Sequence, residues 1–497
     1  MPGPSAQKHN IMLLCYLYKY YFYYLYIMNH FLYENNYSKI VEPKYGMKRD
    51  VLYDNNLTNN ISCSHSYSIN TNQRIDMTSY PTYSIDPIGC KDADDAFSIY
   101  TENDKLFFAI HIADPTEYID LNSNLWNDIV NRTTTKYPSN RPPIHMMPSA
   151  VLEKSSLLGS LPGDVKNAIT VFTEINPTTY QPINEIKLLF TNIFVKKDNA
   201  FSYNQAAIIY NDIFAIHTGL KISEALKQNR AIKTKGVKLN DVSTAYPIYT
   251  EDDVYLYQDT KQEQLMKQMI AEFAIFANSF VGEYLKINLN TGIFRTCVAN
   301  EWLQTVYNEI SGEQLLQEII TNGIRADYMS NIESHDLVGM PEYCHFTSPI
   351  RRLADCICHY LLKYIYFKHN NIFYDIPFTE HELQTLADKC LKITRLEKKN
   401  QYLDIKFRLL QVMANMIVKH ANIDIQYYIT SYSGLFLNLI ICNINQFHVH
   451  MSYSLRVTDY AKDVNPKIKH TLTINQVNCF TKFDQNTIPQ LDSHVLY

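Results

Sequence analysis

The chain has 497 residues, of which 46% are hydrophobic and 19% are charged. This balance excludes an intrinsically disordered chain and allows one large core with one or two small modules. The net charge of −5 is no general signature of nucleic-acid binding, so any path for a nucleic acid must be basic only locally. The ten cysteines form no CxxC pair, which favours reduced thiols in a cytoplasmic compartment over disulfides or zinc.

Residues 1–70 read as an amino-terminal extension without a clear module. Residues 11–33 are long enough to span a membrane, but tyrosine dominates them and Lys19 interrupts them. No small-residue cleavage site follows, as a secretory signal would require. Membrane association is therefore not expected.

Residues 84–98, SIDPIGCKDADDAFS, are the most informative stretch of the chain. The first residues alternate as in a strand, Pro87 ends it, and a glycine lets the loop turn. Within ten residues the stretch then places four carboxylates: Asp86, Asp92, Asp94 and Asp95. Like charges this close raise each other's pKa, and a hard divalent cation such as Mg²⁺ or Mn²⁺ removes the conflict.

Three other interpretations of this acidic stretch have to be weighed. It could be a solvated surface loop, which is the usual fate of a bare acidic tetrapeptide. A calcium-binding EF-hand would need a regular D-x-[DN]-x-[DN]-G pattern, which is absent. A phosphatase-type DPxD motif would need an acid at Gly89.

Residues 106–114, LFFAIHIAD, predict a buried strand. It offers His111 and Asp114 as candidate site residues, although a histidine in such a strand is more often held in the core. Residues 137–148 contain too many prolines for a helix or a central strand, which leaves Tyr137 in a loop.

The middle of the chain predicts helices. Residues 226–239 carry five basic side chains, which is typical of a solvated face but could also follow a nucleic-acid backbone. Residues 262–286 have apolar side chains at helical spacing and predict one long core helix. Glu272 lies within this apolar pattern, so it requires a partner. Residues 383–416 predict a further helix.

Residues 343–362, YCHFTSPIRRLADCICHYLL, predict a helix capped by Thr347 or Ser348 with a proline in its first turn. Arg351, Asp355 and His359 then share one face. Two arginines at the positive end of a helix are unfavourable unless an anion such as phosphate binds there. The alternative is a simple Arg351–Asp355 pair, worth about 0.2–0.5 kcal/mol.

Two of these blocks together resemble a known family. D-P-x(4)-D-x-D-D-A, from Asp86, and HFTSPIRRLAD, ending at Asp355, resemble the signatures of the ribonuclease II and ribonuclease R (RNB) exoribonucleases. The resemblance implies an α+β fold in which a mixed or antiparallel sheet is flanked by helices, in a catalytic domain over residues 71–405. Residues 420–497 alternate as short strands and would form a small S1 or OB-like β-barrel. The cold-shock modules of the family would be missing or degenerate in residues 1–70.

The resemblance also implies roles for single residues. The four aspartates would bind the metal ions, with Asp92, Asp94 and Arg351 as the catalytic group. Residues expected to contact RNA are Tyr137, Tyr203, Glu272, Arg352 and His111. Mg²⁺ would be the cofactor, with Mn²⁺ as a substitute, and no small-molecule cofactor is expected.

The implied activity is hydrolysis of single-stranded RNA from its 3′ end, by a cytoplasmic monomer that releases nucleoside 5′-monophosphates. Four positions depart from the family pattern: Gly159, Lys166, Ala271 and Cys297. These departures motivate the alternative that the chain is a non-catalytic RNA-binding member of the fold.

Overall fold

The computed structural model describes residues 65–137, 143–159, 163–234, 244–249, 254–298, 325–418, 422–433, 436–456 and 469–474. The expectations for residues 1–64, including the apolar stretch at 11–33, lie outside these ranges. Within them, no helix combines the length and apolarity that crossing a bilayer requires.

A five-stranded mixed sheet forms the body of the protein, in the order β1-β6-β5-β4-β3. The antiparallel strands are β3 (Asp95–Glu102), β4 (Lys105–Ala113), β5 (Lys166–Ile175) and β6 (Lys187–Ile193). The short strand β1 (Ile75–Asp76) pairs in parallel with β6. The strand predicted at 106–114 is therefore β4, and the α+β class with a mixed sheet is confirmed.

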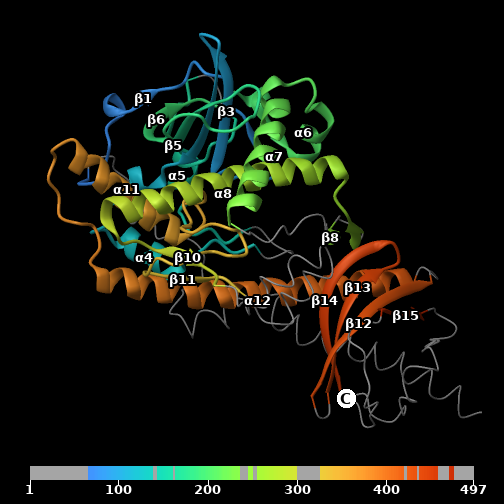
Figure 1. Ribbon diagram of the computed structural model, residues 1–497. Helices are drawn as coiled ribbons and strands as arrows, with labels where there is room; N and C mark the ends of the chain where they lie inside the picture. The colour runs from blue at the N-terminus through green and yellow to red at the C-terminus, as the bar shows by residue number, and fades with distance from the viewer. Residues whose placement is uncertain are drawn as a thin grey trace, which may run out of the picture.

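Helices cover this sheet (Figure 1). The long helix predicted at 262–286 is confirmed as α8 (Lys261–Leu289), which begins with a capping box between Thr260 and Glu263. Phe273 of α8 packs on Phe97 and Phe108 of the sheet, with ring centroids 5.4 and 4.6 Å apart. The other helices are α4 (Asn124–Arg132), α5 (Ser149–Ser155), α6 (Tyr203–Ile209), α7 (Phe214–Thr234), α11 (Leu353–His369) and α12 (Glu380–Val418).

Helices α7 and α8 approach closely at Gly219. A Cβ atom added there would stand 2.9 Å from Met269 Sδ and 3.3 Å from Ile99 Cδ1, so the sheet, α7 and α8 meet where any larger residue requires Met269 to shift. Three short pairs complete the body: β2 (Ser84–Asp86) with β7 (Ala200–Ser202), β8 (Tyr246–Tyr249) with β9 (Val254–Tyr257), and β10 (Phe294–Thr296) with β11 (Asp327–Met329). Single-turn 3₁₀ helices occur at Thr71–Gln73, Pro115–Tyr118 and Lys197–Asn199.

A second, smaller sheet follows α12. Its antiparallel strands lie in the order β14-β13-β12-β15, with β12 (Ile423–Ser433), β13 (Phe436–Ile444), β14 (Phe447–Arg456) and β15 (Lys469–Ile474). It has a core of its own, to which Leu409 and Val412 of α12 contribute. The described strands thus form an open four-stranded sheet at the end of the long helix, consistent with part of the expected OB-like domain (Figure 1).

Candidate active site

The acidic loop joins β2 to β3. Asp86 is the last residue of β2, and Asp95 is the first residue of β3. Between them the chain turns through Cys90, whose amide donates to the Pro87 carbonyl at 3.1 Å, and through Gly89, whose φ of +78° suits glycine. Two strand ends and one tight turn therefore bring the four predicted carboxylates together.

Burial and mutual repulsion dominate the electrostatics of the acidic loop. Burial, together with the neighbouring Asp94 carboxylate, raises the pKa of Asp86 to about 7. Burial and the charge of Asp86 likewise raise the pKa of Asp95 to about 7. The pKa of Asp94 is also raised to about 7 because burial outweighs the opposing effect of Arg351. Such paired, raised pKa values are typical of functional sites.

Arg351 lies against this loop although 257 residues separate it from Asp94. Its Nε donates to Asp94 Oδ2 at 2.9 Å, and the Ile350 amide donates to Asp94 Oδ1 at 2.8 Å. The Arg351 side chain is 43% exposed, so it is held by the acidic loop while it still faces solvent. The convergence of the two sequence blocks on one site is confirmed.

The local structure around Arg351 differs from the prediction. Helix α11 begins at Leu353, with Arg352 in extended conformation before it, so residues 349–351 form a turn and not the first turn of a helix. The reason is Asp355, whose Oδ1 accepts the Ser348 amide and Arg352 Nη2, both at 2.8 Å. The carboxylate holds the turn in place, and the helix starts only after it.

Asp355 belongs to a fully buried polar face of α11. His359 follows one turn later and donates from Nε2 to the Phe346 carbonyl at 3.0 Å. Lys363, one more turn along, pairs with Asp114 and Glu117 at 3.0 and 2.9 Å. The face predicted to meet an anion with Arg351 is therefore turned inward, where it anchors the 346–352 segment.

The predicted loop tyrosine reaches the acidic loop. Tyr137 donates its hydroxyl to Asp92 Oδ2 at 2.7 Å, and its side chain is partly exposed. His145 Nδ1 lies 3.7 Å from the same oxygen. Cys90 contacts Asp86 Oδ1 at 3.8 Å and Asp92 Oδ1 at 3.7 Å. Sequence reasoning missed Cys90 and His145, although both stand within the segments it singled out.

Tyr203 also stands beside the site. It is the first residue of α6, whose N-cap is Ser202 at the end of β7. Strand β7 pairs with β2, and this pairing places Tyr203 next to the acidic loop. Burial raises the pKa of the Tyr203 hydroxyl, and the charges of Asp95 and Asp86 add to the effect. The structure thus brings the tyrosine to the acids, and its contact with RNA stays a prediction.

The expected RNA contact of His111 is contradicted by the structure. The side chain is fully buried in the sheet, where its ring nitrogens bond to Ser98 Oγ at 3.0 Å and Thr170 Oγ1 at 2.9 Å. Asp114 is likewise buried, with Arg74 Nη2 at 2.6 Å. Although burial alone would raise the pKa of Asp114, Lys363 and Arg74 hold it well below its usual range. Both residues are part of the core, which for His111 is the alternative interpretation given above.

Glu272 has the partner that its apolar surroundings require. Arg230 of α7 donates to it from Nη2 at 2.5 Å, and both side chains are 9% exposed. Part of the basic run at 226–239 is therefore used inside the fold, while residues 235–239 lie outside the described ranges. Arg352 is engaged with Asp355, so it positions the turn. RNA contacts of Glu272 and Arg352 stay predictions.

The carboxylate oxygens of the acidic loop suit a hard divalent cation, but the side chains are not arranged around a common point. In the described ranges, no three His, Cys, Asp or Glu side chains lie so that they could hold a metal ion as they stand. Both Asp94 oxygens accept hydrogen bonds, from Ile350 and Arg351, and one Asp92 oxygen accepts from Tyr137. Asp86 Oδ2, in contrast, is buried without a hydrogen-bond partner among the described residues. Oxygen ligands and mutual repulsion both fit a cation at this place.

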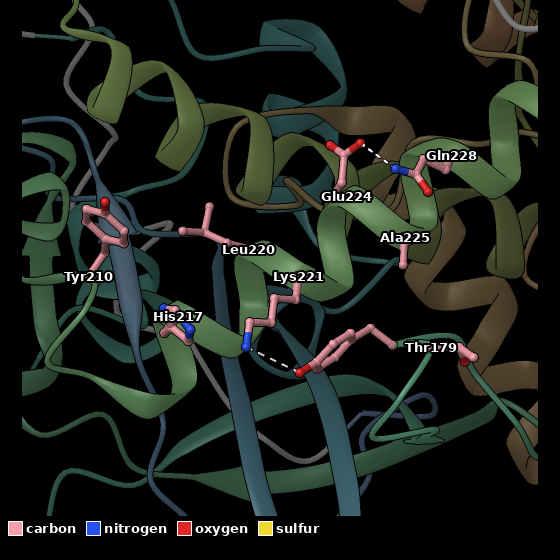
Figure 2. A pocket seen from close by; sticks show the side chains of 9 residues that line it. Thr179, Tyr210, His217, Leu220, Lys221, Glu224, Ala225 and Gln228 are labelled. Atoms are coloured by element: carbon pink, nitrogen blue, oxygen red, sulfur yellow. Dashed lines mark hydrogen bonds between the residues drawn. The ribbon is translucent and has the colours of Figure 1, made fainter.

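A separate hollow of about 430 Å³ lies on α7, lined by Tyr180, Tyr210, His217 and Lys221 among others (Figure 2). Lys221 Nζ donates to the Tyr180 hydroxyl at 3.3 Å. Tyr180 follows β5, whose far end pairs with the Ala113 end of β4 near the acids. The hollow is therefore at the opposite end of the sheet from the acidic loop, and no residue predicted for the site lines it.

The departures from the family pattern have structural explanations where they are described. At Gly159 an added Cβ would stand 2.7 Å from Lys197 Cα, so a cysteine does not fit there. Lys166 is buried and donates to the Glu153 carbonyl at 2.7 Å. Cys297 is buried beside β10. None of the three changes the acidic loop.

Known proteins resemble this chain in sequence. It is 26% identical over 363 residues to the exosome complex exonuclease RRP44 homolog A of Arabidopsis thaliana, covering 63% of this chain and 38% of that protein. It is 25% identical over 371 residues to ribonuclease R of Helicobacter pylori, covering 67% and 55%. The chain thus spans between about a third and about half of the length of these relatives.

Solved structures share the fold. Mycoplasma genitalium ribonuclease R, in complex with ribose-methylated single-stranded RNA, aligns with a TM-score of 0.67 at 16% identity, over 90% of this chain and 76% of that one. Yeast Ssd1, a pseudonuclease, aligns with a TM-score of 0.58 at 16% identity, over 78% and 52%. The RNB domain matches residues 74–368, which is more than half of the chain and includes both the acidic loop and the Arg351 turn. The protein belongs to the RNB family.

Proposed function

We propose that this protein is an exoribonuclease that hydrolyses single-stranded RNA from its 3′ end and releases nucleoside 5′-monophosphates. One observation carries the proposal: Arg351 Nε stands 2.9 Å from Asp94 Oδ2, so a guanidinium, the group suited to bind phosphate, lies against the loop that carries the four carboxylates. Relatives named as ribonucleases, and a structural neighbour solved with RNA, support RNA as the substrate. A monomer in the cytoplasm is part of the proposal.

Asp86, Asp92, Asp94 and Asp95 would hold the divalent cations, most simply Mg²⁺, with Mn²⁺ as a substitute. When bound, the cations would supply Lewis-acid stabilisation of charge on the phosphate. To hold a cation, Asp94 and Asp92 would have to give up their hydrogen bonds with Arg351 and Tyr137. Arg351, which is already exposed to solvent, would then be free to bind phosphate.

The side chains beside the acidic loop would have distinct roles in binding RNA. Arg351 would bind the scissile phosphate through charge-assisted hydrogen bonds, which strengthen as negative charge develops on it. Tyr203 would position the last nucleotide beside Asp95 and Asp86. The charges of these two aspartates contribute to the raised pKa of the Tyr203 hydroxyl. Tyr137, with its partly exposed ring, would stack on a base, which grips any sequence.

The second candidate function is RNA binding without cleavage. The similarity to Ssd1, described as a pseudonuclease, and the departures from the family pattern motivate it. The four aspartates and Arg351 favour the enzyme, because burying carboxylates that repel one another costs free energy and RNA binding does not require it.

A degradation assay separates the two functions. The full chain is incubated with 5′-labelled single-stranded RNA and Mg²⁺, with and without a chelator, beside Asp94→Asn. The control is Asp104→Asn, in the exposed turn between β3 and β4, where φ is +62° and asparagine fits. The enzyme shortens the RNA stepwise only with metal and only with Asp94 present. Intact RNA in every lane, combined with a gel shift, refutes the enzyme and favours the binding protein.

A further inference from the structure

Arg295 differs from the other buried arginines of the described ranges. Three arginines are buried there: Arg74, Arg295 and Arg408. Arg74 Nη2 lies 2.6 Å from Asp114 Oδ2, and Arg408 Nε lies 3.4 Å from Asp404 Oδ1. Arg295 is only 6% exposed, yet it forms no salt bridge and no side-chain hydrogen bond with a described residue. A buried guanidinium without such a partner is costly, which indicates that an anion belongs beside it.

The contacts that Arg295 does make leave its charge uncompensated. Its guanidinium carbon lies 4.6 Å from the centre of the Tyr328 ring, opposite it across β10 and β11, and a cation–π contact does not neutralise a charge. The neighbouring carboxylate, Asp327, is already paired with Arg395 at 2.7 Å. Burial lowers the pKa of Arg295 and the charge of Arg352 acts in the same direction, although Tyr328 and Asp327 oppose them.

Arg352 provides a second guanidinium beside the first. The Arg295 amide donates to the Tyr343 carbonyl at 2.8 Å, so β10 lies alongside the segment that leads to Arg352. Arg352 donates from Nη2 to Asp355, but its Nε is buried without a hydrogen-bond partner among the described residues. Two neighbouring guanidiniums repel each other, and a shared anion removes the repulsion.

We infer that Arg295 and Arg352 bind a second phosphate of the RNA strand, beside the phosphate proposed for Arg351. Arg352 follows Arg351 directly in the chain, and its side chain is 23% exposed, so an anion can reach the pair from solvent. A phosphodiester suits this place because its two free oxygens accept charge-assisted hydrogen bonds from planar guanidinium groups. The inference rests on RNA binding in the proposed function, but not on RNA cleavage.

The test measures how the affinity of the full chain for labelled single-stranded RNA depends on salt, by fluorescence anisotropy in the presence of a chelator. Each phosphate contact to a single strand contributes about 0.7 to the slope of log affinity against log salt concentration. In Arg295→Met this slope should therefore fall by about 0.7. The affinity at low salt should fall about tenfold or more, equally for oligo(A) and oligo(U), because a phosphate carries no sequence information.

Two further variants separate the phosphate contact from other effects. Arg295→Lys retains the positive charge and should keep the slope of the wild type, while its affinity falls because the planar fork is lost. The control Lys368→Met removes one exposed positive charge at the end of α11 and should leave slope and affinity unchanged. A slope in Arg295→Met equal to that of the wild type overturns the inference.

Oligonucleotides with one uncharged methylphosphonate linkage, placed at successive positions from the 3′ end, test the wild type without relying on a variant. We expect at least two linkages at which the substitution weakens binding, and at one of them Arg295→Met should cause no further loss. A single sensitive linkage overturns the inference. Inorganic phosphate that raises the melting temperature, combined with an unchanged RNA slope in Arg295→Met, shows a site for free anions and overturns it as well.

The two proposals fail in different ways. Arg295-dependent binding of RNA that stays intact with Mg²⁺ supports the phosphate site and removes the nuclease. Magnesium-dependent cleavage with an unchanged salt slope in Arg295→Met does the reverse.

Discussion

The acidic loop makes a quantitative prediction about stability. In the protein without metal, Asp94 is 3% exposed, and burial raises its pKa from 3.8 to about 7. Because the pKa is higher in the folded state, this group favours folding only when protonated. Its contribution is complete below pH 3.8 and is lost as the pH rises through 7.

The size of the effect follows from the shift. One pKa unit corresponds to about 1.4 kcal/mol, so ionisation of Asp94 reduces the free energy of unfolding by roughly 1–2 kcal/mol at pH 5 and roughly 4–5 kcal/mol at pH 8. Asp94→Asn carries no such charge. Its stability relative to the wild type should therefore increase by about 3 kcal/mol between the two pH values. Relief of Asp86, whose pKa Asp94 raises, adds in the same direction.

Urea unfolding at pH 5 and pH 8 in the presence of chelator measures this double difference. Effects of the substitution that do not depend on pH, such as changes in packing, cancel in it, whereas the pairing of ionised Asp94 with Arg351 is already contained in its pKa. Excess Mg²⁺ at pH 8 should stabilise the wild type and leave Asp94→Asn nearly unchanged. A relative stability that stays flat or falls with pH would refute the reasoning, as would an equal shift in Asp104→Asn.

Three further predictions concern single side chains. Arg351→Lys, which keeps the charge but loses the planar fork, should lower the single-turnover cleavage rate about 10²–10³-fold, while Arg395→Lys, an exposed arginine on α12, should not. Tyr137→Ala should weaken RNA binding in a gel shift by about tenfold or more. Tyr137→Phe should retain most of the affinity, because stacking needs only the ring. Equal losses of affinity in the two variants would contradict stacking. Lys363→Met should lower the free energy of unfolding by about 3–5 kcal/mol, because it removes one of two buried cations that pair with Asp114 and Glu117. The control Lys368→Met, on the exposed side of α11, should change the free energy of unfolding little.

Local patterns predicted local structure well. The run at 106–114 and the apolar spacing at 262–286 became β4 and α8 within a few residues, because burial on one face leaves its period in the sequence. The need of Glu272 for a partner could also be inferred. That the partner is Arg230, 42 residues earlier, depends on how α7 packs on α8, which no local pattern contains.

The site was predictable in its members and not in its geometry. Both motif blocks were found, and their meeting at Asp94 and Arg351 is confirmed. The start of α11 was misplaced because a side chain seven residues later, Asp355, binds the Ser348 amide. His111 was misassigned because its partners, Ser98 and Thr170, come from neighbouring strands whose register only the folded sheet defines.

Helix α12 has a mechanical consequence. Its 39 residues form an unbroken rod about 58 Å long, and Leu409 and Val412 near its end are built into the core of the C-terminal sheet. A flexible linker would let the C-terminal sheet change its position relative to the rest of the protein. A sharp bend in α12, in contrast, would disrupt hydrogen bonds along the helix backbone. Helix α12 therefore holds the C-terminal sheet at a fixed distance from the five-stranded sheet (Figure 1). An RNA strand that contacted both sheets would have to be long enough to cover that distance.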